Sequence, residues 1–252
     1  MRPRLVLKTS AEVSGIRESC RLAVRVLGEV RGALAAGMST AELDRLAAAR
    51  IREAGGEPAA APGFPGSICL SVNEVAAHGT PSDYRLKAGD TVSVDVAVRL
   101  GGWCGDAAAS FVIGRADAPT RRLLAAARKA LRAGLRAARA GGHLGDIGAA
   151  VELEAGRGGC SVLAELVGHG IGAELHEDPE VPPTGRPGEG LRIVAGMVFT
   201  LEPALSLGSG RLVPGEDGWS WRTEDAARAA QFEHTLAVFR DRTEVLTENP
   251  WY

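Results

Sequence analysis

The chain has 252 residues, of which 45% are hydrophobic, so it is long enough to bury a substantial core. Its 29 Lys and Arg residues nearly balance 31 Asp and Glu residues, and the formal net charge of -2 excludes the global basic field that recruits nucleic acid. No apolar stretch approaches the roughly 18 residues of a membrane-spanning helix, and the first residues have no apolar signal segment. We therefore expect a cytoplasmic protein with neither a nucleic-acid nor a membrane partner.

The four cysteines are spread along the chain, and no two of them form a CxxC pair. This spacing disfavours both a zinc knuckle and the compact disulfide framework of a small secreted protein. We expect reduced thiols at Cys20, Cys69, Cys104 and Cys160.

Two pairs of helices are predicted, one at the start of the chain and one near its middle. Thr9 with Glu12 and Ser39 with Glu42 fit the S/T-x-x-E capping box, in which each side chain satisfies an orphan amide of the first turn. Apolar residues at helical spacing follow both boxes, and Gly55-Gly56 ends the second helix. The helices of the later pair are predicted over 119–140 and roughly 144–156.

Between and after the helix pairs the hydrophobic period changes to two, which is typical of strands. The order of helix pair, strands, helix pair and strands suggests a rough internal duplication. It predicts an α+β fold with pseudo-twofold halves, and no linker is long or polar enough to divide residues 1–252 into separate domains. The predicted strands are 67–72, 91–98, 104–113, 161–167, 198–203 and 232–239.

The strand TVSVDVAV (91–98) carries an acid in an unusual place. Its four valines point to one face, whereas Asp95 points to the other. A hairpin that pairs Arg99 with Gly102 would place Asp95 directly opposite Asp106, with Cβ atoms about 4.5–5.5 Å apart. Two carboxylates at that distance repel each other unless they share a proton or bind a metal ion. The alternative, two solvated acids on an exposed face, stays open.

Three further residues are candidates to join the two aspartates in a metal site. Glu202 and Glu233 are acids within apolar predicted strands, and His169 adds an imidazole in the glycine-rich segment VGHGIGAELHEDP (167–179), which also contains His176. Carboxylates with one histidine suit Mn, Fe, Co or Zn, and five ligands with bridging carboxylates would hold two divalent ions. Each residue alone is weak evidence, because such a histidine is more often a loop residue and a strand glutamate is often a sheet-edge charge.

Five segments follow one another in a distinctive order: GFPGSICLSVNEVAAHGTP (63–81), GDTVSVDVAV with GWCGDAAASF (89–111), GHGIGAELHEDPEV (168–181), GMVFTLEP (196–203) and DGWSWRTEDAARAAQFEHTLAV (217–238). Together they resemble the type I methionine aminopeptidases, over about Thr9 to Thr247. Only 25 residues separate His176 from Glu202, which leaves no room for the helical insert of the type II enzymes. The resemblance implies the pita-bread (creatinase/aminopeptidase) fold and two divalent metal ions of unknown identity.

The resemblance also implies a role for each candidate ligand. Asp95 would chelate one ion, and His169 and Glu202 would bind the other. Asp106 and Glu233 would bridge the two ions. The whole set of five ligands is present in this chain.

Other residues are implied as substrate contacts. His78 and His176 correspond to the two histidines that contact the scissile amide without binding metal, and Glu202 corresponds to the candidate general base. The chain departs from the family pattern at Leu175 and Ala61, where aromatic residues are common, which predicts a wider pocket. One methylene in an apolar pocket discriminates by only about 1–3 kcal/mol, so these changes retune specificity without touching hydrolysis. The expected substrate contacts are Phe64, Cys69, His78, Leu175, His176 and Trp219.

The resemblance therefore implies a monomeric aminopeptidase that removes an N-terminal residue, most simply the initiator methionine, from peptides or nascent proteins. One alternative is an aminopeptidase of the same kind that is specialised for a dedicated peptide and has an altered first-residue preference. Another is a relative that only binds a partner, although such relatives tend to lose metal ligands. Metal content and a panel of X-Ala dipeptides would distinguish the three.

Overall fold

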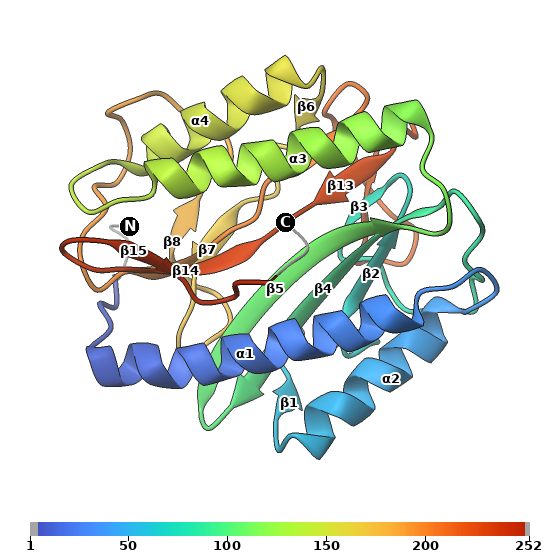
Figure 1. Ribbon diagram of the computed structural model, residues 1–252, viewed down its shortest axis with the longest axis horizontal. Helices are drawn as coiled ribbons and strands as arrows, with labels where there is room; N and C mark the ends of the chain where they lie inside the picture. The colour runs from blue at the N-terminus through green and yellow to red at the C-terminus, as the bar shows by residue number, and fades with distance from the viewer. Residues whose placement is uncertain (1–4, 250–252) are drawn as a thin grey trace.

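The computed structural model describes residues 5–249, and its four helices lie along the outside of the strands (Figure 1). Within these residues, no helix is both long enough and apolar enough to cross a membrane. The two helix pairs predicted from the sequence are confirmed, with α1 and α2 on one side of the view and α3 and α4 on the other. The helices are α1 (Ser10–Ala33), α2 (Thr40–Glu53), α3 (Ala118–Ala137) and α4 (Leu144–Arg157).

Both predicted capping boxes are formed. The Thr9 side chain accepts a hydrogen bond from the backbone of Glu12, whose carboxylate accepts one from Thr9 N at 2.7 Å. Ser39 and Glu42 repeat this arrangement at the start of α2. Each box satisfies two orphan amides of the first turn, which explains where these helices begin.

Within the described residues 5–249, the strands form four small sheets. Their orders are β1-β4-β2 with β5 also paired to β4, β13-β10-β6, β11-β12-β3, and β15-β14-β9-β7-β8. The strands are β1 (Glu57–Pro58), β2 (Cys69–Val72), β3 (Val75–Ala77), β4 (Thr91–Leu100), β5 (Trp103–Val112), β6 (Ser161–Val162), β7 (Gly168–Gly170), β8 (Glu177–Val181), β9 (Val198–Leu201), β10 (Ala204–Ser206), β11 (Leu212–Pro214), β12 (Trp221–Thr223), β13 (Ala229–Gln231), β14 (His234–Val238) and β15 (Thr243–Val245).

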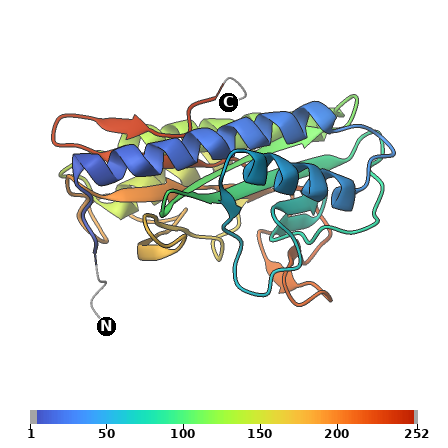
Figure 2. The same cartoon turned by 90° about the horizontal axis from the view of Figure 1, so that it is seen from below.

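The two helix pairs cover two comparable sets of strands. α1 packs on β4 and β5, and α3 packs on β9, β10 and β13. In Figure 2 the helices lie over one side of the strands, whereas the long connecting segments project from the opposite side. This arrangement confirms the predicted α+β fold with two related halves, and it leaves the helix-free side of the strands for a site.

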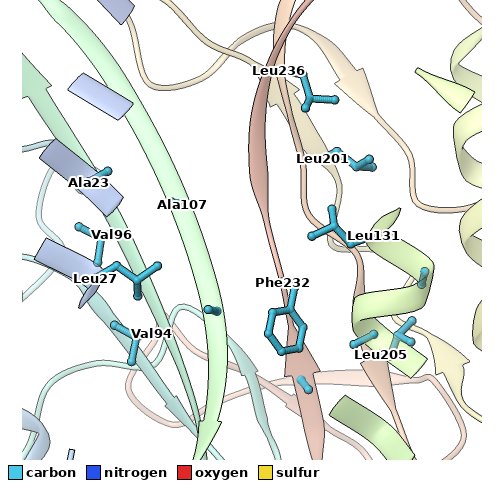
Figure 3. Packing of buried hydrophobic residues seen from close by; sticks show 14 of the residues in the cluster. Ala23, Leu27, Val94, Val96, Ala107, Leu131, Leu201, Leu205, Phe232 and Leu236 are labelled. Atoms are coloured by element: carbon cyan, nitrogen blue, oxygen red, sulfur yellow. The ribbon is translucent and has the colours of Figure 1, made fainter. Parts of the chain in front are cut away.

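The valine face of β4 is part of the core, as its period of two predicts. Its four valines are all fully buried, and Val94 and Val96 point toward Ala23 and Leu27 of α1 (Figure 3). Complete burial of a valine side chain contributes about 1.5–3 kcal/mol to folding, so this face fixes which side of β4 turns away from the helices. Asp95 points to that other side.

The predicted register of the β4–β5 hairpin is wrong. Asp95 pairs with Ala108, and Asp106 pairs with Ala97, so the two aspartates are diagonal rather than opposed. The reason is the turn, which uses Gly101-Gly102 with both residues at positive φ, 59° and 85°. A two-residue loop of this kind favours glycine because both positions have left-handed backbone. The shift is two residues along the partner strand, so both carboxylates still share one face.

Three predicted strands end earlier or break. The segment predicted as 161–167 keeps only β6 as a strand, because the chain then turns. Glu202 lies just beyond β9 and before Pro203, which has no amide proton for a ladder. Glu233 lies in the break between β13 and β14, where its backbone N–H donates to Ala108 O at 2.9 Å. The prediction that both glutamates lie within strands is therefore wrong.

None of the four cysteines forms a disulfide, in agreement with the sequence. Burial raises the pKa of the Cys20 thiol to about 12 and that of Cys104 to about 11. These two thiols therefore stay protonated and unreactive at neutral pH.

Candidate metal centre and substrate pocket

Two carboxylates from the β4–β5 hairpin and a third from a distant part of the chain meet on the helix-free face. Among residues 5–249, Asp95, Asp106 and Glu233 each offer an oxygen, and these oxygens all lie within 4.8 Å of one another. Asp106 is 6% exposed and Glu233 is 1% exposed. Diagonal neighbours in adjacent strands are still within reach of each other. The predicted meeting of the two aspartates thus occurs despite the different register.

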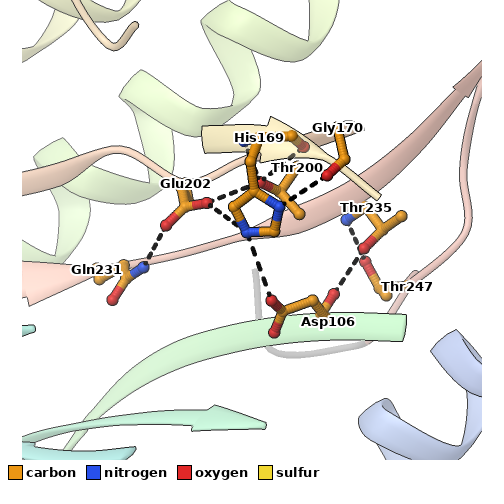
Figure 4. A network of polar contacts seen from close by, with 8 residues as sticks. All are labelled: Asp106, His169, Gly170, Thr200, Glu202, Gln231, Thr235 and Thr247. Carbon is orange, nitrogen blue, oxygen red and sulfur yellow. Dashed lines mark hydrogen bonds and ion pairs between the residues drawn. The ribbon is translucent and has the colours of Figure 1, made fainter. Parts of the chain in front are cut away.

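His169 and Glu202 complete the group from the other half of the molecule. His169 Nε2 lies 3.8 Å from Asp106 Oδ2 and 3.6 Å from Glu202 Oε1 (Figure 4). The structure therefore brings all five predicted ligand residues together. β4 and β5 supply the aspartates, whereas β7 and the chain next to β9 and β14 supply the other three.

The orientation of the His169 ring suits a ligand. Its Nδ1 lies 3.0 Å from the carbonyl oxygen of Gly170, so the N–H sits on Nδ1 and the lone pair of Nε2 faces the carboxylates. Burial, with a smaller contribution from His176, lowers the pKa of His169 to about 4. The imidazole is therefore neutral at pH 7, which is the form that binds metal ions.

Two side chains that the sequence analysis did not identify hold Glu202. The Thr200 hydroxyl donates to Glu202 Oε1 at 2.7 Å, and Gln231 Nε2 donates to Glu202 Oε2 at 3.2 Å (Figure 4). Thr200 Oγ1 also accepts a hydrogen bond from the backbone N–H of His169 at 2.9 Å. Thr200 and Glu202 are two positions apart, so the period of two that identified β9 also places both side chains on one face.

The backbone of Asp106 is held by a short chain of hydrogen bonds. The Thr235 hydroxyl donates to Asp106 O at 2.8 Å, and the Thr235 backbone N–H donates to Thr247 Oγ1 at 3.0 Å (Figure 4). No hydrogen-bond donor within the described part of the chain reaches Asp106 Oδ1, although this oxygen is buried. A buried carboxylate oxygen without a donor is costly, and a cation would compensate for it.

The carboxylates carry strongly raised pKa values. Burial, with a smaller contribution from the nearby Glu202 carboxylate, raises the pKa of Asp106 to about 7. Burial likewise raises the pKa of Glu202 to about 8. Burial and the neighbouring carboxylates also hold the pKa values of Asp95 and Glu233 well above the usual range. Four acids packed in this way repel one another unless they hold protons or positive charge is present. The donor set thus fits divalent metal ions.

A cavity of about 700 Å³ opens directly onto these residues. It holds an apolar wall in which Phe64 stands edge-on to Trp219, with ring centroids 5.5 Å apart. The two departures from the family pattern, Ala61 and Leu175, also line it. All six residues expected to contact substrate lie in its lining: Phe64, Cys69, His78, Leu175, His176 and Trp219.

His78 enters the cavity from an unusual backbone conformation. Its φ is 53°, in the left-handed region that non-glycine residues rarely adopt and that is common at functional sites. The next residue holds it there, because Gly79 N donates to Ser71 Oγ at 3.0 Å and Gly79 O accepts from Leu70 N at 2.8 Å. A Cβ at Gly79 would lie 2.4 Å from Leu70 O, so only glycine fits.

The cavity also has residues that sequence reasoning missed. Trp221 lines it and is 37% exposed, and the acidic side chains of Glu165 and Glu180 lie in its lining as well. Trp221 follows Trp219 by two positions. In an extended segment this spacing places both indoles on one side, so the spacing is a sequence signal that could have identified Trp221. No sequence signal marks the two glutamates, because the segments that carry them meet the cavity only in the folded chain.

A buried, oxygen-rich centre with a neutral imidazole, set beside an apolar cavity, defines a metal-dependent hydrolytic enzyme. The comparison with known families agrees. The chain belongs to metallopeptidase family M24, whose model matches residues 14–239.

Individual relatives cover almost the whole chain. Methionine aminopeptidase B of Synechocystis sp. is 38% identical over 251 residues, which cover 96% of this chain and 92% of that protein. Methionine aminopeptidase 1 of Mycobacterium tuberculosis is 38% identical over 250 residues, which cover 95% of this chain and 94% of that protein. The crystal structure of methionine aminopeptidase from Rickettsia prowazekii superposes with a TM-score of 0.95 at 35% identity, over 97% of this chain and 100% of that chain.

The fold extends to more distant structures. The prolidase from Pyrococcus furiosus superposes with a TM-score of 0.78 at 18% identity, over 97% of this chain but 66% of that chain. This likeness concerns the fold alone. It supports the pita-bread architecture that the sequence resemblance implies.

Proposed function

We propose that this protein is a metal-dependent aminopeptidase that removes the N-terminal methionine from peptides or nascent proteins. The observation that carries the proposal is the meeting of all five candidate ligands beside the apolar cavity. The alternatives, a dedicated-peptide enzyme and a non-catalytic relative, are not favoured, because relatives named methionine aminopeptidase match nearly the whole chain. We further propose that residues 1–252 act as one catalytic domain, as a monomer and in the cytoplasm.

The proposed centre holds two divalent ions, with Mn, Fe, Co and Zn as the candidates. Asp95 would chelate one ion, while His169 and Glu202 would bind the other. Asp106 and Glu233 would bridge them, a role supported by the closeness of Asp106 both to His169 and to the carboxylates of Asp95 and Glu233. When bound, the ions polarise the scissile carbonyl and activate the attacking water.

The two histidines outside the centre bind the scissile amide in this proposal. Burial, and for His78 also the nearby His176, lowers the pKa of both rings, so both are neutral at pH 7. A neutral imidazole presents one N–H and one lone pair, so it can donate to a carbonyl oxygen or accept from an amide. His78 and His176 come from two separate segments of the chain and both line the cavity, so both can contact one bound peptide.

Glu202 is the proposed general base. Thr200 and Gln231 hold its two oxygens, so the carboxylate keeps one orientation. Burial raises the pKa of this carboxyl in the metal-free protein, and the positive charge of bound divalent ions would keep it ionised, which is the form that accepts a proton. Glu202 accepts a proton from the attacking water and delivers it to the leaving amine.

The test is release of methionine from a Met-Ala-Ser peptide by protein loaded with each candidate metal in turn. We expect release with at least one metal, loss of release after exhaustive chelation, and recovery when the metal is restored. Undiminished release after chelation would contradict the proposal. A panel of X-Ala-Ser peptides measures the first-residue preference in the same assay.

A further inference from the structure

A buried ion pair joins the N-terminal segment to the chain that carries His176. Lys8 Nζ contacts Glu177 Oε2, and the two side chains are only 2% and 13% exposed. Lys8 precedes α1, whereas Glu177 is the first residue of β8 and follows His176 directly. Lys8 and Glu177 are 169 positions apart in the sequence, and their contact lies next to His176 of the proposed active site.

The loop between β7 and β8 is shaped around this ion pair. A Cβ at Gly172 would lie 2.5 Å from Lys8 Nζ and 2.5 Å from Glu177 Oε1, so glycine there leaves the space that the pair occupies. The second carboxylate oxygen, Glu177 Oε1, accepts from the backbone N–H of Glu174 at 3.3 Å. One carboxylate thus binds both the lysine and the backbone of its own loop.

The lysine is itself attached to the central strands. Its backbone N–H donates to Gly196 O at 2.7 Å, and Gly196 N donates to Val238 O of β14 at 2.8 Å. The ion pair therefore connects the loop to a part of the fold that packing already fixes. By contrast, the ring of His176 borders the open cavity and stands against His169 with centroids 4.3 Å apart.

The far side of the same loop is held independently. Cys104 N donates to Gly172 O at 2.7 Å, and the Arg99 guanidinium donates to Ala173 O. These bonds hold the first half of the loop. The second half, which carries His176, is held by the pairing of Glu177 with Gly170 and by the Lys8–Glu177 contact. The backbone at His176 therefore lies between anchors on both sides.

We infer that Lys8 and Glu177 are positioning residues that set the orientation of His176, an inference that rests on the proposed contact of His176 with the scissile amide. Removal of either charge leaves its partner buried and unpaired, so the loop must move to hydrate it. A displacement of about 1 Å at a group that orients substrate can lower turnover by about 10²-fold. Glu177 also lines the cavity, whereas Lys8 does not, so Lys8 is the partner whose effect on turnover would pass through the loop and the histidine.

The first experiment compares Lys8→Met and Glu177→Gln with Arg17→Met. Arg17 pairs with Glu244 at 2.7 Å and joins α1 to β15, so its removal breaks a half-buried ion pair that does not involve the loop. We expect kcat on a Met-Ala-Ser peptide to fall by about 10–100-fold in the first two variants, with unchanged metal content, and by less than about 2-fold in the control. Full kcat in Glu177→Gln, the nearly isosteric variant, would overturn the inference.

A double-mutant cycle separates positioning from a general structural effect. In a His176→Ala background, Lys8→Met should change kcat by less than about 2-fold, because the group through which it acts is already gone. The same fold-loss in both backgrounds would mean that Lys8 acts by another route and would overturn the inference.

Amide hydrogen exchange gives a readout that does not depend on catalysis. We expect peptides covering residues 170–178 to exchange faster in Lys8→Met and in Glu177→Gln, with little change in the β4–β5 hairpin. Unchanged exchange in this segment would contradict the inference even if the proposed activity is confirmed.

If the parent protein releases no methionine with any metal, the proposed function fails, and the exchange result still decides whether the ion pair orders the loop.

Discussion

His169 and His176 stand edge to face, with ring centroids 4.3 Å apart and ring planes at 73°. They are seven positions apart, and the chain between them turns so that Glu177 pairs back with Gly170. One ring faces the buried carboxylates and the other lies in the lining of the cavity. One glycine-rich segment thus joins the proposed metal centre to the proposed substrate pocket.

Loss of a bridging carboxylate should abolish both metal binding and activity. In Asp106→Ala and Glu233→Ala, a ligand that serves both proposed ions disappears, so we expect less bound metal and no detectable release of methionine. Metal content by mass spectrometry and peptide hydrolysis measure the two effects. A variant that keeps two metal equivalents would refute the bridging role.

Loss of His78 should separate turnover from metal binding. Because His78 lies in the cavity lining and outside the carboxylate cluster, His78→Ala should keep the metal content of the parent. A positioned proton donor or acceptor contributes about 10²–10⁴-fold, so we expect a fall of that order in kcat. Metal loss in this variant would show that the division between ligand and non-ligand histidines is wrong.

Thr200 supports two ligands at once and provides a test of that support. Thr200→Val keeps the shape of this fully buried side chain but removes the hydrogen bonds to Glu202 Oε1 and to His169 N. Loss of such a supporting partner typically weakens metal affinity by about 10–100-fold. The matched control is Thr223→Val, since Thr223 is also buried and donates to Ala227 O at 2.7 Å away from the centre. Equal metal affinity in the two variants would refute the role of Thr200.

The two positions of the cavity lining that differ from the family pattern should determine which first residue of the substrate is preferred. Leu175 and Ala61 line the cavity, and an aromatic ring at either position would add contacts to a methionine side chain. Leu175→Phe combined with Ala61→Tyr should raise the ratio of kcat/KM for methionine over leucine or phenylalanine. One methylene is worth about 1–3 kcal/mol in such a pocket, so a change of several-fold or more is expected. A flat ratio would exclude these positions as determinants of specificity.

Asp117, the N-cap residue of α3, should make the stability of the protein depend on pH in the acid range. Hydrogen bonds from Thr120, together with Arg228, lower the pKa of Asp117 to about 2. A depressed folded-state pKa gives stability that is fully present above the unfolded value of about 3.9 and is lost as pH falls through about 2. Asp117→Ala should therefore lower the urea midpoint at pH 7, and the difference from the parent should shrink between pH 4 and pH 2. A difference that stays constant over this range would contradict the charged cap.

Short-range patterns in the sequence are enough to predict several features of this fold. The capping boxes at Thr9 and Ser39 and the valine face of β4 depend on residues within a few positions of one another, so the sequence alone predicts them. Four of the five ligand candidates were also identified from sequence as acids in apolar segments, which are costly and so conspicuous, and His169 was identified by its place in a glycine-rich segment.

The tertiary structure alone decided how those residues meet. The hairpin register follows from the Gly101-Gly102 turn, and the placement of Glu233 follows from a strand that leaves one sheet and joins another. The Lys8–Glu177 pair joins residues 169 positions apart. Contacts of this kind depend on how whole elements pack, and short-range periodicity carries no information about that packing.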